Sequence, residues 1–68
     1  MNRGEYRSAI KLYSNAIAKN PYDSLCHRWL GDAYSSLGDK KSAIREWKEA
    51  AKLGDKTIQS YLDYLKID

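Results

Sequence analysis

The chain has 68 residues, 43% of them hydrophobic and 31% charged, and a formal net charge of +3. This length allows one domain at most, with a core that contributes only about 3–5 kcal/mol to stability. One cysteine excludes an internal disulfide, no apolar run approaches the roughly 18 residues of a membrane span, and the modest charge argues against a nucleic-acid binder. We therefore expect an intracellular, cytoplasmic protein without a membrane partner.

Four helices are expected from the spacing of apolar residues and from the residues that start and stop helices. After a short lead-in over residues 1–4, the first helix runs from Glu5 to about Lys19. It ends before Pro21, because the residue that precedes a proline is pushed out of the helical region. Its apolar stripe comprises Tyr6, Ala9, Ile10, Tyr13, Ala16 and Ile17.

Aspartates and glycines delimit the three later helices. Asp23, Asp39 and Asp55 are good N-caps, since a carboxylate accepts hydrogen bonds from the unpaired N–H groups of a first helical turn. Gly38 and Gly54 lie just past two helix ends, where a left-handed backbone is favoured. The apolar positions of the fourth helix are Ile58, Tyr61, Leu62, Leu65 and Ile67. Short links between the helices predict an all-α fold of antiparallel neighbours.

The chain contains an internal repeat. A displacement of 34 residues places small residues on small ones and aromatic residues on aromatic ones. The matched pairs are Gly4 with Gly38, Glu5 with Asp39, Ala9 with Ala43, Ile10 with Ile44, Tyr13 with Trp47, and Ala16 with Ala50. The first and third helices are therefore predicted to be copies of one element, and the second and fourth helices copies of its partner.

This pattern resembles the tetratricopeptide repeat, a helix–turn–helix unit of the same period. The resemblance rests on Leu30, Gly31, Tyr34, Gly38, Ala43, Trp47 and Ala50 in one full repeat, and on Gly4, Ala9, Tyr13, Ala16, Asn20 and Pro21 in half of a preceding one. It implies a single domain over residues 1–68, an all-α helical-hairpin solenoid of about one and a half repeats. Residues 5–19 would be the second helix of a partial repeat, 24–54 a full repeat and 55–68 a capping helix. Gly31 and Ala43 would allow two helices to approach closely, and Trp47 would fill the gap to the next repeat.

Three features depart from the family pattern. His27 stands where an early aromatic residue is common, Gly54 and Asp55 stand where proline is usual, and the first repeat lacks its first helix. The first helix should therefore present an uncovered apolar face. This expected self-association face comprises Tyr6, Ala9, Tyr13 and Ile17. Either a second copy covers it, in a symmetric homodimer or by an exchange of helices, or the chain is a fragment of a longer array.

The resemblance also implies that a peptide or a partner helix binds on the helix that follows Asp23. The residues expected on that groove surface are Leu25, Arg28, Trp29, Asp32, Ser35 and Ser36. Arg28 has an alternative role, because it stands four residues before Asp32 and could form an ordinary ion pair within the helix. Some family members bind an acidic C-terminal tail with a cation and an asparagine one turn later. Asp32 replaces that amide and would repel a carboxylate, which argues against such a receptor.

No catalytic residue, metal site or cofactor is predicted. Cys26 and His27 are adjacent in a helix and project about 100° apart, so they do not converge on one substrate or ion. A core thiol and a half-exposed imidazole are their expected roles. The basic residues are interpreted as a solvated convex face, with a weak contact to an acidic partner or a nucleic-acid backbone as the alternative. They are Arg3, Arg7, Lys11, Lys40, Lys41, Arg45, Lys48 and Lys52.

The sequence therefore predicts a protein–protein interaction module and not an enzyme. Such a module would be a scaffold or adaptor segment that binds a peptide or a partner helix, an expectation that rests on the family resemblance. The alternative is structural: a designed or excised repeat fragment that mainly folds and self-associates, without a ligand of its own.

Overall fold

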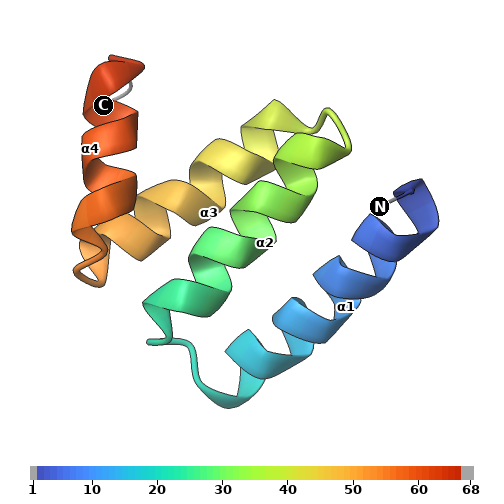
Figure 1. Cartoon of the computed structure of the whole chain (residues 1–68). Helices are drawn as coiled ribbons and strands as arrows, with labels where there is room; N and C mark the ends of the chain where they lie inside the picture. The colour runs from blue at the N-terminus through green and yellow to red at the C-terminus, as the bar shows by residue number, and fades with distance from the viewer. Residues whose placement is uncertain (1, 67–68) are drawn as a thin grey trace.

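The computed structural model describes residues 2–66, which form four α-helices and no strand (Figure 1). The helices are α1 (Arg3–Lys19), α2 (Ser24–Ser36), α3 (Lys40–Lys52) and α4 (Lys56–Tyr64). The predicted all-α class is confirmed, and the four helices follow one another in the predicted order. Helix α4 ends at Tyr64, so Leu65, predicted as one of its apolar positions, is its C-cap instead. Lys66 follows with φ +58°, a left-handed conformation that ends the helix. Ile67, predicted as an apolar position of the fourth helix, and the last residue of the predicted 55–68 segment lie outside the described residues.

The first helix begins earlier than the sequence predicted. Residues 3 and 4 were expected in a lead-in, but α1 starts at Arg3 because the side chain of Asn2 accepts a hydrogen bond from the Glu5 N–H at 3.0 Å. Gly4, which matches the turn residue Gly38 in the repeat, therefore lies inside the first helical turn. Asn20 ends α1 as predicted, directly before Pro21.

Two junctions share one structure, in which a single aspartate ends one helix and starts the next. After α2, Gly38 has φ +87° and the Asp39 N–H donates to the Tyr34 carbonyl at 2.9 Å. The Asp39 carboxylate then accepts from the Ser42 N–H at 3.1 Å, which caps α3. Gly54 (φ +103°) and Asp55 repeat this arrangement between α3 and α4. The predicted glycine turns and aspartate caps are confirmed.

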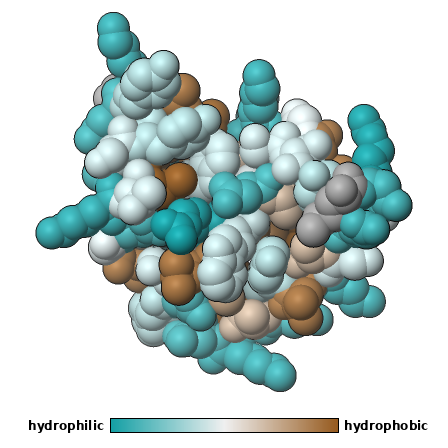
Figure 2. Space-filling view, viewed as in Figure 1, coloured by the Kyte–Doolittle hydropathy of each residue, from teal (hydrophilic) through white to brown (hydrophobic). Residues whose placement is uncertain are grey.

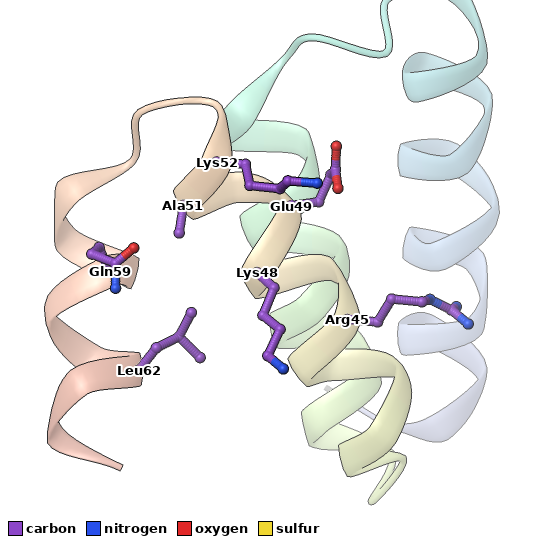
Figure 3. Close-up of a pocket in the computed structure, with 7 residues that line it drawn as sticks. All are labelled: Arg45, Lys48, Glu49, Ala51, Lys52, Gln59 and Leu62. Carbon is purple, nitrogen blue, oxygen red and sulfur yellow. The ribbon is translucent and has the colours of Figure 1, made fainter. Parts of the chain in front are cut away.

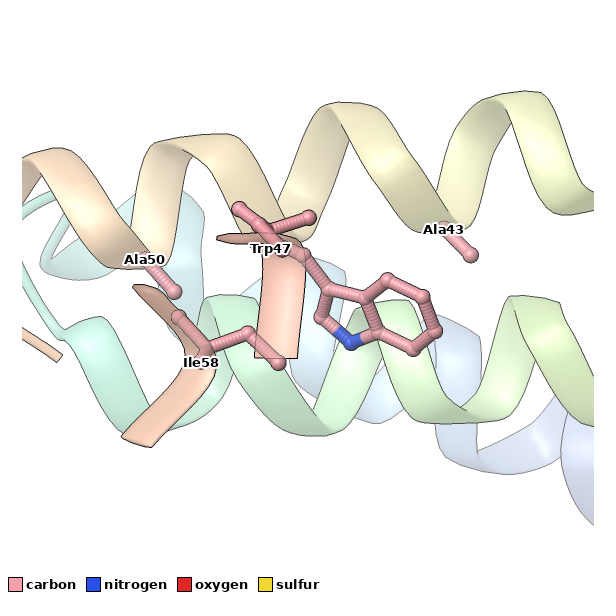
Figure 4. Packing of buried hydrophobic residues seen from close by; sticks show 5 residues of the cluster. Ala43, Trp47, Ala50 and Ile58 are labelled. Carbon is pink, nitrogen blue, oxygen red and sulfur yellow. The ribbon is translucent and has the colours of Figure 1, made fainter. Parts of the chain in front are cut away.

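Helix α3 lies at the centre of the packing. It packs against α2 on one side and α4 on the other, whereas α1 packs on α2 alone among the well-contacted pairs (Figure 1). The buried cluster comprises Ala43, Trp47 and Ala50 of α3 with Ile58 and Leu62 of α4. Figure 4 shows the Trp47 indole in the space between α3 and α2, with Ile58 beside Ala50. By contrast, α1 has no buried residue.

A close approach of α2 to α3 depends on Gly31. A Cβ atom at this position would lie 2.5 Å from Cδ1 and Nε1 of Trp47 and 3.0 Å from the Ala43 carbonyl oxygen. Real Cβ atoms do not tolerate the first of these distances, so the indole occupies the space that glycine leaves free. The predicted close contact through Gly31 and Ala43 is confirmed.

Candidate functional site

Two hollows flank α2 and share part of their lining. The α1–α2 hollow has a volume of about 200 Å³ and is lined by Tyr6, Ala9, Tyr13, Trp29, Asp32, Ala33 and Ser36. The α2–α4 hollow has a volume of about 460 Å³ and is lined by Asp32, Ser35, Ser36, Trp47, Thr57, Ile58 and Tyr61. Because Asp32 and Ser36 line both, the hollows form one continuous surface, which we call the aromatic face.

Aromatic rings form the α1–α2 side of this face. The rings of Tyr13 and Trp29 pack tilted by 40°, with their centroids 5.9 Å apart. Trp29 remains 41% exposed, because α1 covers one side of its indole and the other side faces solvent. A tryptophan that is half open beside a tyrosine is typical of binding surfaces, since both side chains combine a large apolar area with a polar group.

The α2–α4 side is also aromatic, and its geometry is fixed by hydrogen bonding. Tyr61 packs edge-to-face on Trp47, with an interplanar angle of 89° and centroids 5.4 Å apart. The indole Nε1 of Trp47 donates to Oδ1 of Asp32 at 3.1 Å, which links α3 to α2. Tyr61 is 44% exposed, whereas Trp47 is buried apart from the edge that lines the hollow.

The structure brings together residues that the sequence assigned to two separate surfaces. Four of the predicted groove residues, Trp29, Asp32, Ser35 and Ser36, line the aromatic face. Three residues of the predicted self-association face line the same α1–α2 hollow, namely Tyr6, Ala9 and Tyr13. Exposed Leu25 and half-buried Ile17 line neither hollow.

Thr57 and Tyr61 belong to the face but were not predicted as site residues. Tyr61 was assigned to the apolar side of the fourth helix, since its helical spacing does not distinguish a buried ring from one that lines a groove. The internal repeat offered a usable signal, because a fourth helix that copies the second should contribute to the same surface.

Arg28 does not pair with Asp32. Its Nη1 atom lies 3.3 Å from Oδ2 and 3.5 Å from Oδ1 of Asp55, so the ion-pair partner is the N-cap of α4 rather than the next turn of α2. Asp55 is buried, and the guanidinium faces the carboxylate oxygen that does not cap the helix. Arg28 thus fastens α2 to the α3–α4 junction.

His27 is buried, and the expectation of a half-exposed imidazole is wrong. Its Nδ1 lies 2.9 Å from Oε1 of Glu46 in α3, and its Nε2 lies 2.9 Å from the carbonyl oxygen of Pro21 in the α1–α2 link. Both partners accept hydrogen bonds, so an imidazole that carries protons on both nitrogens satisfies the site. Burial lowers the pKa of His27, but hydrogen bonds to Glu46 and Pro21 and the charges of Glu46 and Glu49 raise it, and the net direction is upward.

Cys26 is a buried core thiol, as the sequence indicated. Its Sγ donates to Oδ2 of Asp23 at 3.3 Å, and burial raises the pKa of the thiol. Since Cys26 and His27 contact different partners, they form no nucleophile–base pair. Within residues 2–66, no group of three His, Cys, Asp or Glu side chains is arranged to hold a metal ion.

The basic residues line different hollows. A hollow of about 460 Å³ between α3 and α4 is lined by Arg45, Lys48, Glu49, Ala51, Lys52, Gln59 and Leu62 (Figure 3). Another, of about 380 Å³, lies between the start of α1 and the end of α2 and includes Arg3 and Arg7. Figure 2 shows hydrophilic side chains projecting around the edge of one face, with apolar side chains in separate patches between them.

Across the helices that the structure describes, none combines the length and the apolar character that crossing a bilayer requires. Comparison of the chain with protein-family models, with curated proteins and with solved structures gave no match.

Proposed function

We propose that the chain is a protein–protein interaction module of the tetratricopeptide type, which binds a segment of a partner protein on the aromatic face. The observation that carries this proposal is the incomplete burial of α1. This helix has 17 residues and an apolar stripe, yet none of its residues is buried, and Tyr6 and Tyr13 open into a hollow beside the half-exposed Trp29. Apolar area of this kind marks an interface more often than a free surface.

Two further features support the repeat assignment. The α2–α3 and α3–α4 junctions use the same glycine–aspartate device, as expected for stacked helical hairpins. The contact of Gly31 with Trp47 and Ala43 gives the close helix approach that the repeat pattern implies. A receptor for acidic C-terminal tails gains no support, since the guanidinium of Arg28 already pairs with Asp55.

A display library of random peptides, selected on the wild-type protein, tests this function. We expect enriched peptides whose binding is lost in Tyr13→Ala and retained in Leu12→Lys. Leu12 is the matched control, because it neighbours Tyr13 in α1 but is 66% exposed and lines no hollow of the aromatic face. A selection that yields no binders, or binders indifferent to Tyr13→Ala, would refute the proposal.

A second candidate function is self-association through the same helix, favoured by the absence of any buried residue in α1. In that case the aromatic face of one copy covers α1 of another, as a symmetric homodimer. The solution mass, measured by light scattering across a hundredfold range of concentration, decides between a dimer and a monomer. A mass of twice the 7.8 kDa chain that persists on dilution and falls in Tyr13→Ala supports the dimer, whereas a folded monomer throughout excludes it.

A further inference from the structure

Charge is distributed unevenly over the molecule. The chain carries a net charge of +3, yet neither hollow of the aromatic face is lined by a lysine or an arginine. Arg45, Lys48 and Lys52 line the hollow between α3 and α4, and Arg3 and Arg7 line the one beside α1. Lys40 lines a further hollow of about 310 Å³, which shares Ser35, Trp47 and Tyr61 with the α2–α4 hollow. Among these hollows, the two of the aromatic face have no lysine or arginine in their lining, so a positively charged ligand meets less repulsion there than in the others.

Asp32 supplies the negative charge of this face. It is exposed and is the one ionisable carboxylate that lines both hollows. Its Oδ1 accepts from the Trp47 indole, which fixes the direction of the carboxylate. No lysine or arginine between residues 2 and 66 lies within ion-pair distance of it. Because a carboxylate offers about four lone-pair sites, the indole leaves most of its acceptor capacity for a ligand.

From these observations we propose that the aromatic face selects peptide segments that carry an arginine or a lysine, whose charged group binds Asp32 between the rings of Trp29 and Tyr61. This inference rests on the proposed function and specifies the chemistry of its partner. Both residues are more than 40% exposed and line the two hollows that Asp32 joins, so a cation at Asp32 also lies near aromatic surface.

Arginine fits this site better than lysine. A guanidinium is planar and carries five N–H donors, so it can donate to the carboxylate in parallel while its flat face rests on an aromatic ring. The hydroxyl groups of Ser35, Ser36 and Thr57 border the same surface, and their oxygens can accept hydrogen bonds from the remaining N–H groups of the guanidinium. An acidic peptide or a phosphate backbone would be repelled by Asp32, whose charge no ion pair among the described residues neutralises.

The two tryptophans provide the readout, since Trp29 and Trp47 are the only ones in the sequence and one lines each hollow. Peptides selected as described above are expected to be enriched in arginine and lysine. A synthetic copy of a selected peptide, and its version with citrulline in place of arginine, are then titrated while tryptophan emission is recorded. Citrulline keeps the shape of arginine without its charge. We expect the arginine peptide to bind about fivefold more tightly, and the difference to shrink at high salt.

The variant Asp32→Asn removes the charge but keeps an oxygen that can accept from the Trp47 indole, so the fold is preserved. We expect it to abolish the preference for arginine over citrulline. Asp63→Asn is the matched control: it removes an exposed carboxylate of α4 that accepts from Gln59 and lines neither hollow of the aromatic face. It should leave the preference intact.

The outcomes separate this inference from the proposed function. Peptides that depend on Tyr13 but are not enriched in cations would overturn the inference and leave the interaction module standing. A preference for arginine that survives in Asp32→Asn would also overturn it, because the cation would then bind elsewhere. If no peptide binds and wild-type dimers dissociate in Asp32→Asn, the cation comes from a second copy of the chain, and the peptide-binding proposal falls with the inference.

Discussion

Helices α1 and α3 carry equivalent residues but differ in what covers them. The pairs at equivalent positions are Ala9 and Ala43, Tyr13 and Trp47, and Ala16 and Ala50. All three residues of α3 are buried, and all three of α1 are only half-buried. Helix α3 has α2 on one side and α4 on the other, whereas α1 has a well-packed neighbour only in α2 among the described helices. The same apolar pattern is therefore buried only where two neighbouring helices cover it, and α1 has one such neighbour among the described helices.

The largest expected effect comes from shortening the two equivalent aromatic residues. Trp47→Ala removes the centre of the buried cluster and should cost about 3–5 kcal/mol, which is comparable to the whole stability of a small core. Tyr13→Ala, at the equivalent position in α1, should cost about 1 kcal/mol or less because its ring is half-exposed. Circular dichroism with urea denaturation measures both. Equal losses would mean that α1 is packed as tightly as α3.

A smaller effect is expected when a methyl group is added at two helical glycines. Gly31→Ala drives a Cβ atom into the Trp47 indole and should destabilise the protein by about 1–3 kcal/mol. In α1, Gly4 has a helical backbone and its Cβ would meet only the Asn2 side chain, at 3.3 Å, so Gly4→Ala should be neutral or stabilise by up to about 1 kcal/mol. Thermal melts compare the two. If the Gly31→Ala variant were as stable as the wild type, the position of the Trp47 indole would not depend on the absence of a side chain at residue 31.

The contact between His27 and Glu46 should make stability depend on pH on the alkaline side. Although burial lowers the pKa of His27, its hydrogen bonds and the nearby carboxylates raise the value above the ordinary 6.5 in the folded protein. The stabilisation is therefore complete below pH 6.5 and is lost as the pH rises through the folded-state pKa. Groups that face the imidazole are Glu46 and Glu49 of α3 and Asp23 at the start of α2.

Urea denaturation at a series of pH values from 5.5 upward measures this dependence. Glu46→Gln removes the charge that holds the imidazolium, so its stability should vary less with pH than that of the wild type. A wild-type stability that stays flat from pH 6 to 9 would contradict the assignment of two protons to His27.

The smallest expected effect is a difference in acid between two helix caps, Asp39 of α3 and Asn2 of α1. Hydrogen bonds from Ser42 lower the pKa of Asp39 below its ordinary value of 3.8, so this carboxylate stabilises α3 above that pH and ceases to do so as the pH falls through the lowered pKa. Helix α1 is capped by Asn2, which does not titrate in this range. Amide hydrogen exchange should therefore show the Ser42 N–H losing protection in acid while the Glu5 N–H keeps its own. Parallel loss at both amides would show that acid unfolds the chain as a whole.

Local signals account for most of what the sequence predicted correctly. The proline after Asn20, the glycines at 38 and 54 and the aspartate caps act within a few residues, so helix positions follow from them without knowledge of the packing. Asn2 was missed as a cap because residues 1–4 were interpreted as a lead-in to the apolar stripe, which begins at Tyr6. The resemblance to the tetratricopeptide repeat also implied the close approach of Gly31 to Ala43, a contact that joins consecutive helices.

Contacts between distant residues could not be predicted in the same way. Arg28 and Asp55 are 27 positions apart, and His27 and Glu46 are 19 positions apart, so their pairing depends on the angles at which helices cross. Arg28 had a plausible partner in Asp32 at helical spacing, and the choice of Asp55 follows from the end of α3 reaching α2. The joining of groove and self-association residues around one hollow likewise required the placement of α1 on α2.

Asp39 and Asp55 each serve two helices, and this leaves α2, α3 and α4 without spare chain between them. At each junction the same residue donates its N–H to the helix behind and accepts with its carboxylate from the helix ahead. Because neighbouring helices share an aspartate, a rotation of one of them must move the next one as well. The link from α1 to α2 differs because two residues divide these tasks: the Asn20 N–H donates to the Ala16 carbonyl of α1 at 2.9 Å, and the Asp23 carboxylate caps α2. Tyr22, which lies between them, is 79% exposed. We expect residues inserted at Tyr22 to leave the coupling of α2, α3 and α4 intact. One residue inserted at Gly38 should break the coupling of α2 to α3, because Asp39 could no longer contact both helices.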